Sequence, residues 1–236
     1  MNVSIDVLDH GKVCLLESMG DDYTISRAAR VVRPDNEDPR AMGADEKLLT
    51  YMLDNGHTSP FEHVTFNWYV KLPIFVTRQW HRHRTWSYNE ISGRYRELDP
   101  EFYIPKPETI GAQSAKNHQS RDITKISDRD LEVRRTQCLM VESYCRQQFY
   151  RYQDLIASGW PRELARILLP LNTYTEMTAT VNLHNLLKFL EQRMDGHAQW
   201  EIRQYARVLY SLIYKVVPLT CDIWRDLHPG LEYPND

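Results

Sequence analysis

The stretch 64-VTFNWYVK-71 decides the fold, because its apolar and polar side chains alternate without a break. Successive side chains of a strand point to opposite faces, so Val64, Phe66, Trp68 and Val70 share one face of this segment. The alternation predicts a half-buried strand whose apolar face packs against a core.

Further strands are predicted on both sides of this stretch. Residues 3–20 read as two strands around the turn Asp9-His10-Gly11, and the threonine-rich segment 172–183 reads as another strand. The segment after residue 83 contains serine, asparagine and glycine, which disfavour a continuing helix. We expect it to run as an irregular loop into a strand.

Helical spacing of apolar residues marks most of the remaining chain. Residues 128–158 carry apolar side chains at intervals of three and four, which is typical of a long amphipathic helix. Asp22 or Thr24 is the expected N-cap of the first helix, and residues 33–43 form a polar, turn-rich loop. The other helices are expected at 21–32, 44–57, 74–83, 161–169, 184–194 and 198–217.

The chain shows no internal repeat, low-complexity tract or linker. We therefore expect residues 1–236 to form a single α+β domain, with a central, mainly antiparallel sheet flanked by long helices. Its 236 residues are 42% hydrophobic and 26% charged, as in an ordinary globular protein.

The charge and apolar patterning exclude several classes of protein. The net charge of −3 argues against nucleic-acid binding, and no apolar run is long enough to span a membrane. The N-terminal residues lack the basic and then apolar pattern of a secretory signal, so a cytoplasmic location is expected. Cys14, Cys138, Cys145 and Cys221 form no CxxC pair, which predicts buried, reduced thiols and no metal site.

The segment 82-RHRTWSYNEISGRYR-96 concentrates positive charge in a chain that is negative overall. Its arginines, with Arg78 just before it, offer planar guanidinium groups that suit phosphate oxygens. Ser87, Asn89, Ser92 and the Gly93 amide add neutral donors, whereas Glu90 suits a ribose hydroxyl or an arginine. A nucleotide has both an anionic and a neutral end, and it would use both kinds of residue.

Other interpretations of this basic segment remain open at this point. Arginines interleaved with aromatic rings can form a stacking platform for nucleic acid, although the net charge opposes it. His81 and His83 are two residues apart, which places them on one face only in a strand, so zinc binding is disfavoured. A solvated loop with aromatic anchors is the remaining alternative. No Gly-x-Gly-x-x-Gly or Walker motif is present.

The basic segment resembles the signature of the flavin-dependent thymidylate synthases, the ThyX family. That signature is Arg-His-Arg, seven residues and then Ser, matched here by Arg82-His83-Arg84 and Ser92. Further blocks agree in order and cover most of the chain: RAARV at 27–31, HTSPFEH at 57–63, RQW at 78–80, PRELARILLPLN at 161–172, VNLHNLLKFLEQR at 181–193 and HAQWEIRQYA at 197–206.

The resemblance implies a methyltransferase that makes dTMP from dUMP. In this family the carbon comes from 5,10-methylenetetrahydrofolate and the reducing equivalents come from NADPH through FAD. The resemblance also implies a homotetramer whose active sites are shared between subunits, with no nucleic-acid or membrane partner. An inactive flavin- or nucleotide-binding relative is the alternative within the same family.

The resemblance also implies which residues bind each ligand. The dUMP contacts would be Gln79, Arg82, Glu90, Ile91, Ser92, Gly93, Arg94, Arg166 and Arg193. The FAD contacts would be Ser59, Arg82, His83, Arg84, Glu90, Asn182, His184, Lys188 and His197, with His57 and Glu62 flanking the flavin.

Taken singly, several of these residues have ordinary structural explanations. Arg166 and Arg193 can be surface arginines at helix ends, His57 can belong to a helix C-cap, and Asn182 or His184 can cap the following helix. Trp80, Trp86, Tyr88 and Trp200 are expected to be packing residues. Val32 stands where the family usually has a flavin-contacting serine.

By resemblance, Arg193 would stabilise negative charge at the N3–O4 edge of the pyrimidine and so raise the electron density at C5. The spacing of its helix predicts that Arg193 lies on the same side as Leu186, Phe189 and Leu190, facing inward. None of the cysteines lies in a matching block, so no enzyme thiolate is expected to attack C6. Ser92 is expected to be a dUMP ligand, because no histidine base is placed to activate it.

Overall fold

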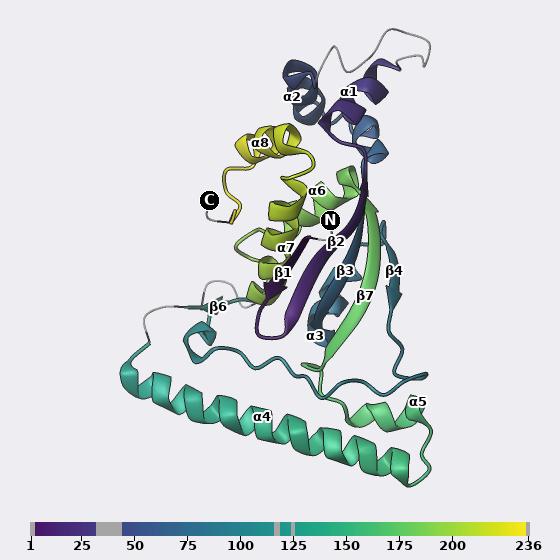
Figure 1. Ribbon diagram of the computed structural model, residues 1–236. Coiled ribbons are helices and arrows are strands. Elements are labelled where there is room, and N and C mark those ends of the chain that lie inside the picture. Colours follow the sequence, from purple (N-terminus) through teal and green to yellow (C-terminus); the bar gives the residue numbers. More distant parts are fainter. Residues whose placement is uncertain (1–2, 32–43, 116–118, 124–125, 235–236) are drawn as a thin grey trace.

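The computed structural model describes residues 3–31, 44–115, 119–123 and 126–234; Val32 and the loop predicted at 33–43 lie outside the described residues. A five-stranded sheet has the order β1-β2-β3-β7-β4, and each neighbouring pair is antiparallel, as predicted (Figure 1). The strands are β1 Val3–Val7, β2 Gly11–Met19, β3 Thr65–Pro73, β4 Ser87–Glu90 and β7 Tyr174–Asn182.

The predicted strand lies at the centre of this sheet, because β3 has β2 on one side and β7 on the other. Phe66, Trp68, Val70 and Leu72 are fully buried, whereas the alternate residues of β3 are half-buried. Along the β3–β7 ladder, Trp68 lies opposite Ala179, so a small residue leaves room beside the large ring. The period of two in the sequence thus identifies the core face of the sheet.

Three helices cover that face of the sheet: α3 Ile74–Trp80, α6 Leu183–Arg193 and α7 Trp200–Ile213 (Figure 1). Their apolar residues and those of β3 and β7 form one continuous core. A second set of helices gathers at one end of the sheet: α1 Asp22–Arg30, α2 Glu46–Asp54, the 3-10 helix η2 Ser59–His63 and α8 Pro218–Leu227.

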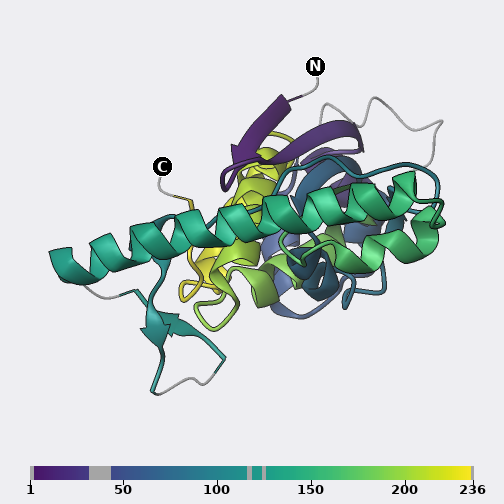
Figure 2. The same cartoon turned by 90° about the horizontal axis from the view of Figure 1, so that it is seen from below.

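The long helix α4, Asp128–Ala157, runs past the opposite end of the sheet, and Figure 2 shows it crossing the whole molecule. Its second half packs in a separate small core with Phe102 and Ala165. Shorter elements flank it: η3 Pro107–Thr109, β5 Ala112–Gln113, β6 Arg121–Asp122, α5 Arg162–Ala165 and η4 Arg166–Leu168. Large apolar side chains of α4 remain exposed, namely Val133, Leu139, Met140, Val141, Tyr144 and Tyr150.

The N-cap expected for the first helix was wrong. Asp21 is the N-cap of α1, and its side chain accepts the backbone N–H of Thr24 at 2.9 Å. Thr24 completes a capping box by accepting the backbone N–H of Asp21. Asp22 is buried instead, and it accepts the backbone N–H groups of Leu219 and Thr220 at 2.9 Å each. Asp22 therefore caps α8, 197 residues away from it in sequence.

Two further differences concern helices. The helix predicted at 161–169 is short and irregular, because α5 ends at Ala165 and continues as the 3-10 helix η4 before Pro170. Helix α8 was not predicted, although Pro218 at its first position suits a helix start. Within the described residues, no helix combines the length and the apolar composition that crossing a membrane requires.

Candidate functional site

The predicted site residues form three groups along the described chain, and the first group surrounds Arg193. Arg193 is the last residue of α6, and His83 lies in the turn that follows α3. The Arg193 Nε–H donates to Nε2 of His83 at 2.9 Å, and Nη2 donates to the backbone oxygen of Gln79 at 3.3 Å. The guanidinium thus lies at the inner edge of α6, as the helical spacing predicts.

The environment of His83 determines its charge. Burial, and then the positive charge of Arg193, lower the pKa of His83 to about 4, and its ring packs edge-on against Phe189 at 4.7 Å. Burial also lowers the pKa of Arg193 from its ordinary value. Because guanidinium is only a donor, Nε2 of His83 must carry the lone pair, and the ring proton is then on Nδ1. At neutral pH, His83 is a neutral acceptor for Arg193.

The second group follows strand β4. The Glu90 side chain accepts a hydrogen bond from the Thr175 hydroxyl at 2.8 Å, and the Ile91 N–H donates to the Glu176 backbone oxygen at 2.9 Å. The chain then turns at Ser92, whose Oγ accepts the N–H of Arg94 at 3.3 Å. These contacts hold the backbone of the signature segment against the edge of the sheet.

Gly93 brings Arg166 into this second group, although the two residues are far apart in sequence. A Cβ at position 93 would lie 3.4 Å from Cδ of Arg166, so the arginine stem passes close to the glycine backbone. Arg94 pairs with Glu163 at 3.5 Å, and both side chains are more than half exposed. An exposed ion pair of this kind is weak in solvent, so Arg94 and Arg166 both remain available to an anionic ligand.

The third group lies where α6 begins, beside η2. The side-chain oxygen of Asn182 accepts the N–H of Asn185 at 2.9 Å and so caps α6. The capping role considered for Asn182 from the sequence is therefore confirmed for this oxygen. Burial, followed by the charge of Lys188, lowers the pKa of His184, while Glu62 acts in the opposite direction. Ser59 is the exposed first residue of η2, which packs against α6.

The remaining predicted residues are exposed. No described acidic side chain lies within salt-bridge distance of Arg82 or Arg84, which follow α3 in the turn. The His197 side chain is 84% exposed, and its Nδ1 lies 2.8 Å from Oδ1 of Asp195. His57 is exposed just after Gly56, which has a φ of 67° at the end of α2, as expected for a helix C-cap.

Trp80, Trp86 and Tyr88 pack in or against the core, as predicted, whereas Tyr95 of the signature segment is exposed. Trp80 and Trp86 are buried and meet edge to face at 5.6 Å. The Tyr88 hydroxyl donates to the backbone oxygen of His83 at 2.9 Å and so braces the turn that carries this histidine. Trp200 is half-buried under the guanidinium of Arg121 at 5.4 Å.

No described hydrogen bond joins a cysteine side chain to a residue of the three groups. All four cysteines are free and buried, as predicted, at Cys14 on β2, Cys138 and Cys145 on α4, and Cys221 on α8. Burial raises the pKa of the Cys138 thiol and, more strongly, that of Cys221. A raised pKa disfavours the thiolate that a nucleophile requires.

Two residues beside the first group were not predicted from the sequence: Gln199 contacts Gln79, and Glu201 contacts Gln199. The Gln79 amide donates from Nε2 to Oε1 of Gln199, and Gln199 donates from Nε2 to Oε2 of Glu201 at 2.9 Å. Both residues lie in the block HAQWEIRQYA, but a polar residue beside a helix start reads as solvent-exposed. In the sequence, the one indication that Glu201 is buried is its position next to the apolar Ile202, which is itself buried in the structure.

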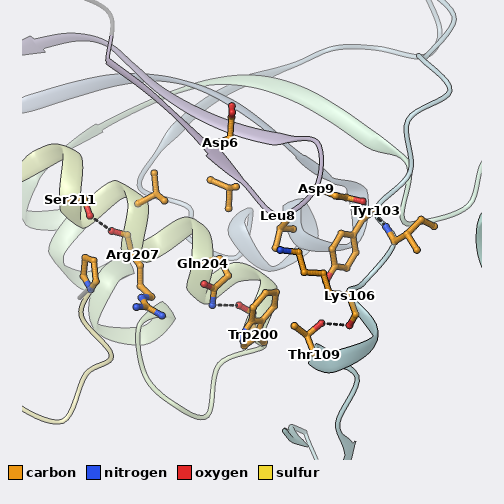
Figure 3. Close-up of a pocket in the computed structure, with 14 residues that line it drawn as sticks. Asp6, Leu8, Asp9, Tyr103, Lys106, Thr109, Trp200, Gln204, Arg207 and Ser211 are labelled. Atoms are coloured by element: carbon orange, nitrogen blue, oxygen red, sulfur yellow. Dashed lines mark hydrogen bonds between the residues drawn. The ribbon is translucent and has the colours of Figure 1, made fainter. Parts of the chain in front are cut away.

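A cavity of about 430 Å³ lies apart from these groups and contains none of the predicted site residues. Figure 3 shows Asp6, Leu8 and Asp9 from the β1–β2 hairpin on one side, and Trp200, Gln204 and Arg207 from α7 on the other. Asp9 is already engaged, because it accepts the Ile104 N–H at 2.9 Å. Cavity size alone therefore does not identify the site.

Comparison with known proteins agrees with the signature. The family model described as thymidylate synthase complementing protein matches residues 14–219. The chain is 45% identical to a flavin-dependent thymidylate synthase of Treponema denticola, over 94% of this chain and 81% of the relative. It is 44% identical to a flavin-dependent thymidylate synthase of Thermotoga neapolitana, over 92% of each chain.

A solved structure has the same fold. The UMP/dUMP methylase PolB from Streptomyces cacaoi, bound with 5-Br UMP, is similar with a TM-score of 0.81 and 32% sequence identity. The match covers 98% of this chain and 99% of that chain. Together, the signature, the match over residues 14–219 and the identity along nearly the full length show that the chain belongs to the family of flavin-dependent thymidylate synthases.

Proposed function

We propose that the protein methylates dUMP reductively to dTMP, taking the carbon from 5,10-methylenetetrahydrofolate and reducing equivalents from NADPH through FAD. The observation that carries this proposal is the fixed position of Arg193, held by His83 and by the backbone of Gln79 within the signature region. The names of the relatives and of the PolB structure support the same substrate and reaction class.

The proposed dUMP contacts supply the charge that a nucleotide monophosphate requires. The Arg166 side chain passes beside Gly93, Arg94 is the next residue in the chain, and the exposed pair of Arg94 with Glu163 is weak, which suits a dianionic phosphate. The proposed set is Gln79, Arg82, Glu90, Ile91, Ser92, Gly93, Arg94, Arg166 and Arg193.

The proposed FAD residues also fit their ligand. Exposed guanidinium groups at Arg82 and Arg84, without a described acidic partner, suit the diphosphate of FAD. When bound, FAD supplies the hydride chemistry that protein side chains cannot perform. The proposed set is Ser59, Arg82, His83, Arg84, Glu90, Asn182, His184, Lys188 and His197.

Arg193 is proposed to polarise the pyrimidine. Its Nε and Nη2 are engaged by His83 and Gln79, while Nη1 makes no hydrogen bond to a described residue. A guanidinium edge facing N3 and O4 would stabilise negative charge there, and the electron density at C5 would rise for attack on the methylene carbon. This route needs no enzyme cysteine, consistent with the buried thiols.

We also propose a homotetramer with shared active sites. Asn182 and Arg193 flank α6, so they lie about 16 Å apart along its axis at 1.5 Å per residue. Asn182 of the FAD set and Arg193 of the dUMP set are thus separated within one chain. In the proposed tetramer, a second chain brings complementary groups to each of them. The exposed apolar residues of α4, such as Leu139 at 67%, provide a surface for such an assembly.

The test is to record the visible spectrum of the purified protein, add NADPH, and then measure dTMP formed from dUMP and methylenetetrahydrofolate. We expect a flavin band that NADPH bleaches, turnover to dTMP, and a tetrameric mass by light scattering. A colourless protein that binds nucleic acid would instead support the stacking platform. Flavin binding without dTMP formation would support the inactive relative.

A further inference from the structure

Glu201 is a buried acid that the proposed mechanism does not use. Its side chain is 2% exposed at the start of α7. Oε1 accepts a hydrogen bond from the Tyr103 hydroxyl at 3.1 Å and forms an ion pair with Nη1 of Arg121 at 2.9 Å. Oε2 accepts a hydrogen bond from Nε2 of Gln199 at 2.9 Å. Each neighbour in this set is a donor, so the carboxylate is held as an acceptor.

The carboxylate determines which way the Gln199 amide points. An ionised carboxylate only accepts hydrogen bonds, so the NH₂ group of Gln199 must face Glu201. Its oxygen must then face the opposite way, where it meets the Gln79 side chain.

The side-chain amide of Gln79 is oriented in the same way. The Gln199 oxygen accepts, so the Gln79 amide must direct its NH₂ group toward it. No described residue donates to the amide oxygen of Gln79, so this oxygen is left as an acceptor. Because the backbone oxygen of Gln79 also binds Nη2 of Arg193, the residue is anchored beside the proposed catalytic arginine.

We propose that Glu201 is a positioning residue: through Gln199 it orients the Gln79 amide so that an acceptor oxygen faces the nucleotide. This inference rests on the proposed function, in which Gln79 contacts dUMP. A fixed acceptor pairs with a hydrogen-bond donor of the nucleotide, such as N3–H of uracil or the ribose hydroxyl. A freely rotating amide would present its oxygen for only part of the time.

The test is equilibrium binding of dUMP to the FAD-loaded protein by calorimetry. Glu201→Gln conserves shape but places both an oxygen and an NH₂ group at this position, so it no longer dictates which way the Gln199 amide points. We expect the dissociation constant to rise about five- to tenfold, as for one neutral hydrogen bond. Gln199→Met interrupts the same series of hydrogen bonds without altering Glu201, and it should raise the dissociation constant for dUMP equally. This second variant serves as the test if Glu201→Gln does not fold.

The control separates orientation from general stability. Tyr103→Phe removes one donor to Glu201 but leaves Gln199 in place, so dUMP affinity should stay at the wild-type value even if Tm falls. In a Gln79→Ala background, Glu201→Gln should cause no further loss, because the amide that it orients is absent.

A swap provides the sharpest readout. In the double variant Glu201→Gln with Gln199→Glu, the carboxylate at 199 accepts the Gln79 NH₂ group directly, and dUMP affinity should return to near the wild-type value. A merely structural role of Glu201 predicts no recovery. The inference about Glu201 is overturned if the swap does not restore dUMP affinity, or if Glu201→Gln binds dUMP as tightly as the wild-type protein. Neither result would affect the proposed function. Absence of dUMP binding by the wild-type protein overturns the proposed function as well.

Discussion

The Arg193 Nε–H donates to Nε2 of His83 at 2.9 Å and joins the end of α6 to the turn after α3, 110 residues away in sequence. The contact requires His83 to be neutral, and burial lowers its pKa to about 4 so that this condition holds at neutral pH. The orientation of the proposed catalytic arginine therefore depends on the protonation state of its neighbour.

Loss of Arg193 should separate the two halves of the reaction. In Arg193→Ala, reduction of bound flavin by NADPH should continue, while dTMP formation should fall about a hundredfold or more, because a transition-state charge loses its stabilisation. Arg193→Lys should recover only part of the rate, since ammonium lacks the planar fork. Stopped-flow absorbance and product analysis measure the two steps. Arg207→Ala, at the cavity in Figure 3, is the matched control. Unchanged dTMP formation in Arg193→Ala would contradict the proposed role.

Replacement of Arg82 should weaken two ligands at once. Arg82 is assigned to both dUMP and FAD, so Arg82→Ala should raise both dissociation constants about tenfold, the loss of a charge-assisted hydrogen bond. Flavin retention after gel filtration and dUMP calorimetry measure this. A variant that keeps its flavin and its affinity for dUMP would rule out the shared site.

The cysteines should be dispensable for the chemistry. A variant with Cys14, Cys138, Cys145 and Cys221 all replaced by alanine should still form dTMP, because each thiol is buried and none makes a described hydrogen bond to a proposed site residue. Its Tm should fall, since alanine leaves small cavities, most of all at the fully buried Cys221. Activity is therefore measured well below the new Tm. Complete loss of turnover in the folded, flavin-bound variant would show that a thiol takes part.

His83 should make stability depend on pH. Its folded pKa lies below its ordinary value of 6.5, so the unfolded chain binds the proton more tightly than the folded chain. The contribution of His83 to the free energy of unfolding is complete above about pH 6.5 and is lost as the pH falls toward about 4. The expected result is a smaller drop in Tm over this range for His83→Gln than for the wild-type protein. Parallel curves for the two proteins would exclude this linkage.

Asp22 should matter more for stability than the neighbouring cap Asp21. Asp22→Ala leaves the N–H groups of Leu219 and Thr220 without their acceptor in a buried place, and should cost about 2–3 kcal/mol. Asp21→Ala removes an exposed helix cap and should cost about 1 kcal/mol. Urea unfolding of both variants compares them. Equal costs would mean that the buried contact with α8 contributes no more to stability than an exposed helix cap does.

The sequence by itself determined which face of β3 and which face of α6 is buried. The alternation in β3 identified its core residues, and the spacing in α6 placed Arg193 on the inner side with Phe189 and Leu190. These properties are local, because the direction of each side chain follows from the geometry of a strand or helix. The family signature similarly indicated the candidate residues, since it is a pattern along the chain.

Only the tertiary structure decided which residues meet. Asp22 reads as the cap of its own helix, yet it caps α8. Gly93 receives Arg166 from a distant segment, and Glu201 reaches Gln79 through Gln199. Such pairings depend on how separate elements pack. The periodicity of a single segment does not indicate which residue of a distant segment it will contact. A buried carboxylate must find donors wherever the fold supplies them, so its neighbours are set by packing and not by sequence distance.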